Sequence, residues 1–184
     1  MNIDKILSVG ETQEIEFKQS MSLLKEGCKA LCGMLNTDQG SGAVFFGIND
    51  SNEVVGIDGN IDSTQKKISL HISTKFDPKL KHSIQLLSKN NLTVLVLFAK
   101  RAEDVSFYEY DGRGYIKEGS TKRTLTILEK NNLEKCRNRN NHNGPWKCDK
   151  CATFIGMLGS IALTDKGPKK NYKCNCGGEY WPIN

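Results

Sequence analysis

The 184-residue sequence lacks any hydrophobic run long enough to cross a membrane, which takes roughly 20 apolar residues. Its longest apolar run, residues 92–99, has the length of a strand. Residues 1–8 lack the basic region and apolar segment of a secretion signal. These absences predict a soluble, cytoplasmic protein with no membrane partner.

The absence of one motif and the number of cysteines limit the cofactors that the sequence predicts. No G-x4-GK[ST] stretch occurs, so the sequence predicts no ATP-binding phosphate loop. The seven cysteines are odd in number, and four of them stand in two tight pairs near the end of the sequence. This usage indicates a reducing compartment and a metal site in preference to a disulfide framework.

Excess positive charge is missing from most of the sequence and concentrated at its end. Residues 1–134 hold 17 Lys and Arg against 18 Asp and Glu, a net charge of −1. Residues 135–184 hold 9 against 3, a net charge of +6. We interpret this asymmetry as the mark of a polyanionic partner, namely nucleic acid, and the alternative is a solvated basic surface.

The length suits one domain of ordinary size with a small appendage. Residues 131–143 are rich in Asn and Arg and almost without apolar side chains, which is typical of a linker. The predicted organisation is therefore a domain over 1–134, a basic polar linker over 135–146 and a cysteine-containing module over 147–184.

The four paired cysteines predict a structural zinc site in that module. Two close pairs of thiolates can surround one tetrahedral zinc ion, and the ligands predicted are Cys148, Cys151, Cys174 and Cys176. The second pair is one residue shorter than a usual zinc knuckle, so His142 or Cys136 stays open as a replacement ligand. Zinc binding would supply most of the stability of so small a module.

Cations and flat rings surround the cysteines, a mixture that binds phosphate backbones and stacks unpaired bases. The predicted nucleic-acid contacts in the module are Lys147, Lys150, Lys169, Lys170 and Lys173, beside the rings of Trp146, Tyr172 and Trp181. The alternative for the rings is the core of the module.

In the first domain, residues 10–20 predict a turn and a short strand, followed by a helix capped by Ser20. The apolar positions of that helix recur every three or four residues: Leu24, Cys28, Leu31, Cys32 and Leu35. Residues 43–48 predict a buried strand, and residues 53–57 a second strand paired with it through an acidic turn.

Further along, residues 61–76 predict a helix that ends before Pro78, and residues 81–87 and 92–98 predict two strands. The second should be central in a sheet because it is apolar on both faces. Asp111-Gly112 predicts a hairpin turn, and a last helix should run from a Thr124 or Thr126 cap through Leu133.

Several short motifs follow one another along the first domain: E-x4-EFK at 11–18, LNT before a glycine-rich step at 35–37, GIND at 47–50, VG at 55–56 and YIKEGST at 115–121. Their order and spacing resemble the Schlafen AlbA-like domain over residues 5–134. The sequence departs from the family pattern with Lys117 in place of arginine, with a looser glycine step at 38–42, and with Asn49 where an aspartate is common.

The resemblance implies an α+β fold, a mixed sheet packed with helices, followed here by the zinc-ribbon-like module. Family nucleases use two glutamates and an aspartate, which here correspond to Glu11, Glu16 and, offset by one position, Asp50. Such carboxylates would hold Mg²⁺ or Mn²⁺ at a phosphodiester. Strand alternation alone would put Glu14, not Glu11, on the face of Glu16, unless the chain bends near Glu11.

Two functions are therefore open. One is a metal-dependent endoribonuclease acting on structured RNA such as tRNA, and the other is a non-catalytic DNA- or RNA-binding protein. In the first domain, the predicted nucleic-acid contacts are Lys18, Lys117, Lys122 and Arg123. Family nucleases join two related lobes into a clamp, and this sequence has one lobe, so the resemblance implies a homodimer.

Overall fold

The structure, a computed structural model, describes residues 2–138, 146–148, 150, 154–155, 176–177 and 180–182. It divides into two compact units, Met1–Ala102 with Phe107–Leu125, and Glu103–Ser106 with Thr126–Asn184. Each unit is described by itself. Within the described ranges, no helix combines the length and apolar character needed to span a membrane.

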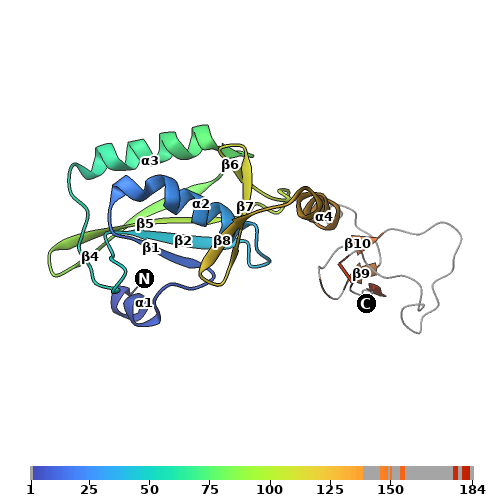
Figure 1. The fold of residues 1–184 in the computed structure, drawn as a ribbon, viewed down its shortest axis with the longest axis horizontal. Coiled ribbons are helices and arrows are strands. Elements are labelled where there is room, and N and C mark those ends of the chain that lie inside the picture. The colour runs from blue at the N-terminus through green and yellow to red at the C-terminus, as the bar shows by residue number, and fades with distance from the viewer. Residues whose placement is uncertain are drawn as a thin grey trace, which may run out of the picture. The chain divides into compact units, whose positions relative to one another are not determined.

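The first unit is built on a mixed four-stranded sheet with the order β1-β2-β5-β4 (Figure 1). β1 runs parallel to β2, and the other neighbours are antiparallel. The strands are β1 (Ile15–Lys18), β2 (Ser41–Phe46), β4 (His82–Lys89) and β5 (Leu92–Lys100). β5 is an interior strand and residues 94–97 are buried, which confirms the prediction from its apolar run.

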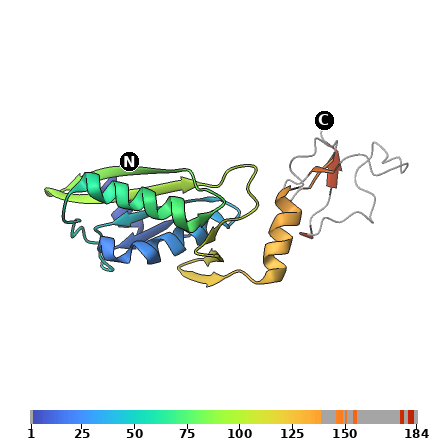
Figure 2. The ribbon, with the colours of Figure 1, turned by 90° about the horizontal axis from the view of Figure 1, so that it is seen from above.

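Helices cover both faces of this sheet. α2 (Leu24–Leu35) and α3 (Ile61–Lys75) lie side by side on one face, and α1 (Ile3–Val9) lies on the other (Figures 1 and 2). A short 3₁₀ turn, η1 (Met21–Leu23), leads into α2. The α1 face has a core of Phe17, Ala43, Phe45, Ile48, Val94 and Val96, against which Ile3, Ile6 and Leu7 pack.

A second, antiparallel sheet lies beside α2, with the order β3-β6-β7-β8. Its strands are β3 (Phe76–Asp77), β6 (Glu109–Tyr110), β7 (Arg113–Glu118) and β8 (Thr121–Thr124). Two glycines let α2 approach both sheets closely. A Cβ on Gly27 would lie 2.8 Å from the ring of Phe46 in β2, and one on Gly33 would lie 3.0 Å from the backbone nitrogen of Lys117 in β7.

One buried side chain fixes the second sheet to the end of α2. Asn36 Nδ2 donates to the carbonyl oxygens of Tyr108 (2.8 Å) and Tyr115 (2.7 Å), and the Tyr108 backbone nitrogen donates to Asn36 Oδ1 (2.8 Å). Because Asn36 is 1% exposed, these bonds replace water that the side chain has lost. β7 is therefore held at a fixed position beside the helix.

The second unit contains α4 (Ile127–Asn138) and a small antiparallel sheet of order β10-β9-β11. Its strands are β9 (Trp146–Cys148), β10 (Phe154–Ile155) and β11 (Tyr180–Pro182). Thr126 caps α4, since its hydroxyl accepts from Glu129 N (3.2 Å) and the Glu129 carboxylate accepts from Thr126 N (2.8 Å). The helix runs to Asn138, so the predicted 135–146 linker begins inside it.

The α+β class is confirmed, and so is the Asp111-Gly112 turn, with φ angles of 52° and 73°. The predicted strand at 53–57 is wrong, because that segment makes only one bridge, between Ile48 and Val54. The Asn49 side chain accepts from the backbone nitrogens of Ser51 and Glu53 and closes a turn, and β2 pairs with β5 instead.

Helix α1 was not predicted, although its ends carry ordinary signals. The Asn2 side chain accepts from the backbone nitrogens of Asp4 and Lys5, as a helix cap does. Gly10, with a φ of 76°, ends the helix. The rest of the segment is too short for its apolar spacing to distinguish a helix from a loop.

Candidate functional site

Of the predicted acidic residues, Glu16 lies on β1 and Glu11 just before it. β1 is an edge strand whose outward side carries no neighbouring strand in the described structure. The backbone groups of alternate residues face β2: Ala43 N donates to Glu14 O (2.8 Å), and Gly47 N donates to Lys18 O (2.7 Å). The N–H and C=O groups of Ile15 and Phe17 therefore face outward.

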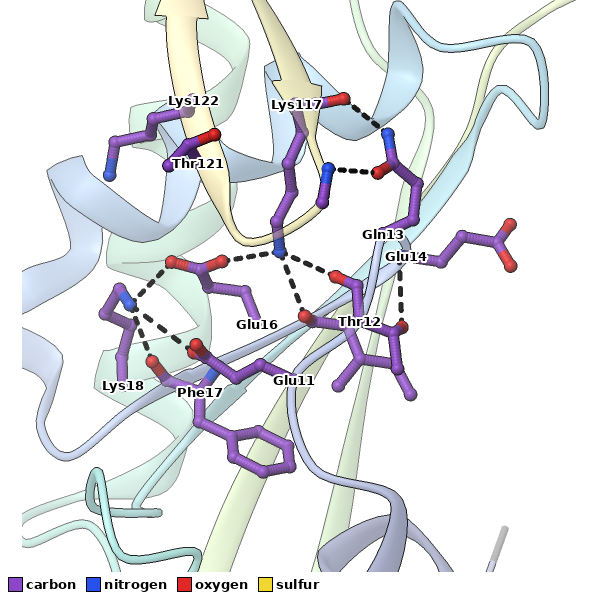
Figure 3. A network of polar contacts seen from close by, with 12 residues as sticks. Glu11, Thr12, Gln13, Glu14, Glu16, Phe17, Lys18, Lys117, Thr121 and Lys122 are labelled. Atoms are coloured by element: carbon purple, nitrogen blue, oxygen red, sulfur yellow. Dashed lines mark hydrogen bonds and ion pairs between the residues drawn. The ribbon is translucent and has the colours of Figure 1, made fainter.

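Side chains and a neighbouring turn supply partners for all four outward groups (Figure 3). Phe17 N donates to Glu11 Oε1 (2.7 Å), and Lys18 Nζ donates to Phe17 O (2.6 Å). Lys117 Nζ donates to Ile15 O (3.0 Å), and Ile15 N donates to Thr12 O (3.4 Å). Glu11, Lys18 and Lys117 thus complete the hydrogen bonding of β1.

The Glu16 carboxylate lies at the centre of this network and is held by two lysines. Its Oε1 accepts from Lys18 Nζ and its Oε2 from Lys117 Nζ, each at 2.7 Å. Burial alone raises the pKa of Glu16, but the hydrogen bonds and charges of Lys117 and Lys18 outweigh it and hold that pKa below the ordinary value. Both carboxylate oxygens of the ionised side chain are therefore engaged.

Lys117 is 1% exposed, so the structure assigns its ammonium group to the interior instead of to a nucleic-acid surface. The ammonium has three acceptors: Thr12 O (2.8 Å), Ile15 O (3.0 Å) and Glu16 Oε2 (2.7 Å). Gln13 fixes the same region, because its Nε2 donates to Lys117 O and its Oε1 accepts from Gly119 N (2.6 Å). β1 and β7 are thus joined by a fully satisfied polar network.

Glu11 and Glu16 both approach Lys18, although strand alternation alone placed the two glutamates on opposite faces. Reciprocal hydrogen bonds between the backbones of Thr12 and Ile15 bend the chain, and Glu11 turns back toward β1. Lys18 Nζ lies 4.0 Å from Glu11 Oε1 and 2.7 Å from Glu16 Oε1. Glu14 instead accepts from the Ser41 hydroxyl (2.7 Å).

Asp50 is exposed in the turn after β2, and the Asn49 side chain is used in that turn, where it also donates to Glu53. Across the described ranges, no three His, Cys, Asp or Glu side chains are arranged to hold a metal ion. Lysine ammonium groups occupy both Glu16 oxygens. As arranged here, the three predicted acids do not fit a catalytic Mg²⁺ or Mn²⁺.

The other predicted contacts are divided between the two units. Lys122 Nζ lies 3.1 Å from Glu26 Oε2, and Arg123 Nε donates to Glu118 Oε1 (3.1 Å). Lys150 is exposed, and the backbone of Lys147 lies in β9. Predicted contacts that fall outside the described residues are Lys169, Lys170 and Lys173.

Half of the predicted zinc ligands fall within the described residues. Cys148 ends β9, and Cys176 is exposed in a turn beside Gly177, which has a φ of 79°. Cys151, Cys174 and the alternative ligand His142 lie outside the described residues. Four thiolates remain a donor set that suits zinc, and the zinc site stays a prediction.

Sequence reasoning missed the roles of Thr12 and Gln13, and it placed Lys117 at the surface. Thr12 acts through its backbone carbonyl, which no side-chain pattern reveals. Lys117 pairs with a glutamate 101 positions earlier in the chain. The one available signal was that Lys117 stands within a strand whose neighbouring positions are partly apolar.

The first unit is thus an α+β domain in which a polar network on the edge strand β1 joins two sheets around one central helix. The Schlafen AlbA_2 family model matches residues 11–126, and the chain belongs to this family.

Solved structures include similar domains. The DIP2311 protein from Corynebacterium diphtheriae is similar with a TM-score of 0.53 and 17% identity, over 73% of this chain and 28% of that protein. This chain therefore spans less than a third of that protein's length, and the likeness shows the fold alone.

This chain is also similar, with a TM-score of 0.48 and 21% identity, to the N-terminal domain of a putative ATP-dependent DNA helicase RecG-related protein from Nitrosomonas europaea. The match covers 68% of this chain and 91% of that domain. Among curated proteins, none matches the sequence.

Proposed function

We propose that this chain is a nucleic-acid-binding protein that does not cut its ligand at Glu11 and Glu16. The observation that carries the proposal is the pairing of both Glu16 oxygens with Lys18 and Lys117 at 2.7 Å. A metal ion there would have to displace two ammonium groups, one of them on a side chain that is 1% exposed. Membership of the family and the net charge of +6 on residues 135–184 support nucleic acid as the ligand.

The second candidate is the metal-dependent endoribonuclease acting on structured RNA such as tRNA. The proximity of Glu11 and Glu16 to the same lysine favours it, since these are the two acids that the family resemblance selects. That function requires an arrangement in which Lys18 and Lys117 release Glu16. Asp50 would also have to approach from the turn after β2.

One experiment separates the two candidates. The full chain is incubated with total tRNA, and separately with duplex DNA, with and without Mg²⁺ or Mn²⁺, and the products are separated on native and denaturing gels. The binding proposal expects a mobility shift with intact nucleic acid under all conditions. Discrete fragments that disappear in a Glu16→Gln variant would establish the nuclease instead, and the absence of both a shift and fragments would overturn both candidates.

We also propose that residues 147–184 hold one structural zinc ion through Cys148, Cys151, Cys174 and Cys176, on the chemistry of this donor set. Metal analysis of the purified chain should give one zinc per chain, and a Cys174→Ser variant should lose it while His142→Ala keeps it. A zinc content well below one contradicts the site. The homodimer implied by the family resemblance stays a prediction, which light scattering on the full chain would test.

A further inference from the structure

Basic side chains gather on the exposed side of α2 and on the strands beside it. α2 is buried where it faces the two sheets, and the side chains it presents to solvent include Lys25 and Lys29. These two residues are four positions apart, so they lie on the same side of the helix. Together with three cations of neighbouring elements they form what we call the α2 basic surface: Lys25, Lys29, Lys75, Arg113 and Lys122.

Ion pairs connect α2 to β8. Glu26 lies between two cations, 2.7 Å from Lys29 Nζ and 3.1 Å from Lys122 Nζ. Lys122 stands directly opposite Lys117 in the β7–β8 ladder, and it lies beside the Glu16 network in Figure 3. One carboxylate therefore brings two lysines from different elements together and neutralises only one of them.

The end of α3 joins the same surface through the β6–β7 turn. Lys75 Nζ lies 2.7 Å from Asp111 Oδ1, and Asp111 N donates to Lys75 O (2.8 Å). Arg113 is opposite Tyr110 in the β6–β7 ladder, two positions after Asp111. Charge effects agree with this closeness: burial lowers the pKa of His71 on α3, and the charges of Lys75 and Lys25 lower it further.

The surface carries more cations than its own acids neutralise. Glu26 and Asp111 are the two acids that pair with it, against five cations. Within the described part of the chain, Lys25 and Arg113 form no ion pair, and both are exposed. Exposed cations held at several fixed points on rigid elements are suited to the repeated charges of a phosphate backbone.

We propose that the α2 basic surface binds the phosphate backbone of a nucleic acid, so that the first unit itself contacts the ligand. This inference rests on the proposed function, and it adds a contact surface outside the basic residues 135–184. It also assigns binding roles to Lys25, Lys29, Lys75 and Arg113. Lys122 joins them through the Glu26 pair, whereas Lys117 does not take part.

The test removes the two cations that have no acidic partner. The full chain and its Lys25→Ala/Arg113→Ala variant are titrated into fluorescently labelled RNA and DNA of the same sequence, from 50 to 200 mM salt. The matched control is Lys5→Ala/Lys100→Ala, which removes the same charge from exposed residues on the α1 face of the sheet. We expect the slope of log K against log salt to fall by roughly two in the variant, and the control to keep at least most of the parent slope.

A second variant should change the affinity in the opposite direction, because it removes an acid from the surface and no cation. Glu26→Gln releases Lys29 and Lys122 from their acid, so binding should tighten and the salt slope should steepen. Loss of binding by Lys25→Ala/Arg113→Ala on RNA, on DNA or on both supports the surface and identifies its ligand. A parent that binds while this variant keeps the parent affinity and slope overturns the inference and leaves the proposed function intact. A parent that binds neither nucleic acid overturns the proposed function itself.

Discussion

Lys117 and Lys122 stand opposite each other in the same two-stranded ladder, yet they differ in burial and in the partners of their ammonium groups. The side chain of Lys117 is 1% exposed and satisfied by three acceptors, whereas that of Lys122 is 29% exposed and has one acidic partner. A buried ammonium group must find protein acceptors to replace water, and an exposed one keeps its water. The strand that carries each residue, β7 packed against α2 or the edge strand β8, thus separates a structural lysine from a lysine available to a ligand.

The largest expected effect comes from removing the buried member of this pair. Lys117→Ala leaves the Glu16 carboxylate with Lys18 alone and the Thr12 carbonyl without its ammonium donor. Breaking one side of a buried ion pair in this way should lower the free energy of unfolding by about 3 kcal/mol. Urea unfolding followed by circular dichroism measures it. A loss below about 1 kcal/mol would mean that the network contributes little.

Low pH should weaken the buried network around Lys117 by protonating Glu16. Its pKa is held below the ordinary value of 4.5 for a glutamate, so the stability it contributes is present above that value and is lost as the pH falls through the folded pKa. The parent should therefore lose unfolding free energy more steeply between pH 5 and pH 3 than a Glu16→Gln variant does. Equal slopes for the two proteins would contradict the pairing. At pH 7 the variant should cost about 2 kcal/mol, because Lys117 loses its charged partner.

The close approach of α2 to β7 can be tested at Gly33. A Cβ at this position would lie 3.0 Å from Lys117 N, a backbone atom fixed by the network around it. Overpacking should outweigh the helix propensity gained from alanine, and Gly33→Ala should lower the free energy of unfolding by about 1 kcal/mol. A stabilised variant, measured by thermal unfolding, would show that β7 can move away without cost.

The smallest effect on stability is expected at the exposed lysine. Lys122→Ala removes a partly exposed ion pair with Glu26, so the free energy of unfolding should change by about 0.5 kcal/mol or less. Nucleic-acid affinity should nevertheless fall, with a salt slope lower by roughly one. A variant that loses stability but keeps its affinity would reverse the roles that we assign to Lys117 and Lys122.

Features within one element could be predicted from the sequence, because local spacing records them. The periodic apolar positions of α2, the interior strand β5 and the Asp111-Gly112 turn all follow from neighbouring residues. The strand predicted at 53–57 failed although the turn before it is present. The backbone nitrogens of Val55 and Gly56 both donate to Gly47 O, so no ladder continues beyond the single bridge at Val54.

The arrangement of the candidate site could not be predicted in the same way. Lys117 meets Glu16 where Gly33 lets β7 lie close to α2, and those three residues come from three separate elements. The family pattern identified Glu11 and Glu16 as partners, but it could not show which cations neutralise them. That information depends on a pairing across 101 positions of the chain.

The hydrogen bonding on the outward side of β1 also bears on whether a second copy of the chain can pair with this edge strand. An edge strand with unpaired N–H and C=O groups is a template on which a second chain can add a strand, and such additions lead to aggregation. On β1, the groups of Ile15 and Phe17 already have partners within the chain, two of them lysine ammonium groups. A second copy could extend the sheet there only by displacing Lys18 and Lys117, so the network closes this edge to sheet extension.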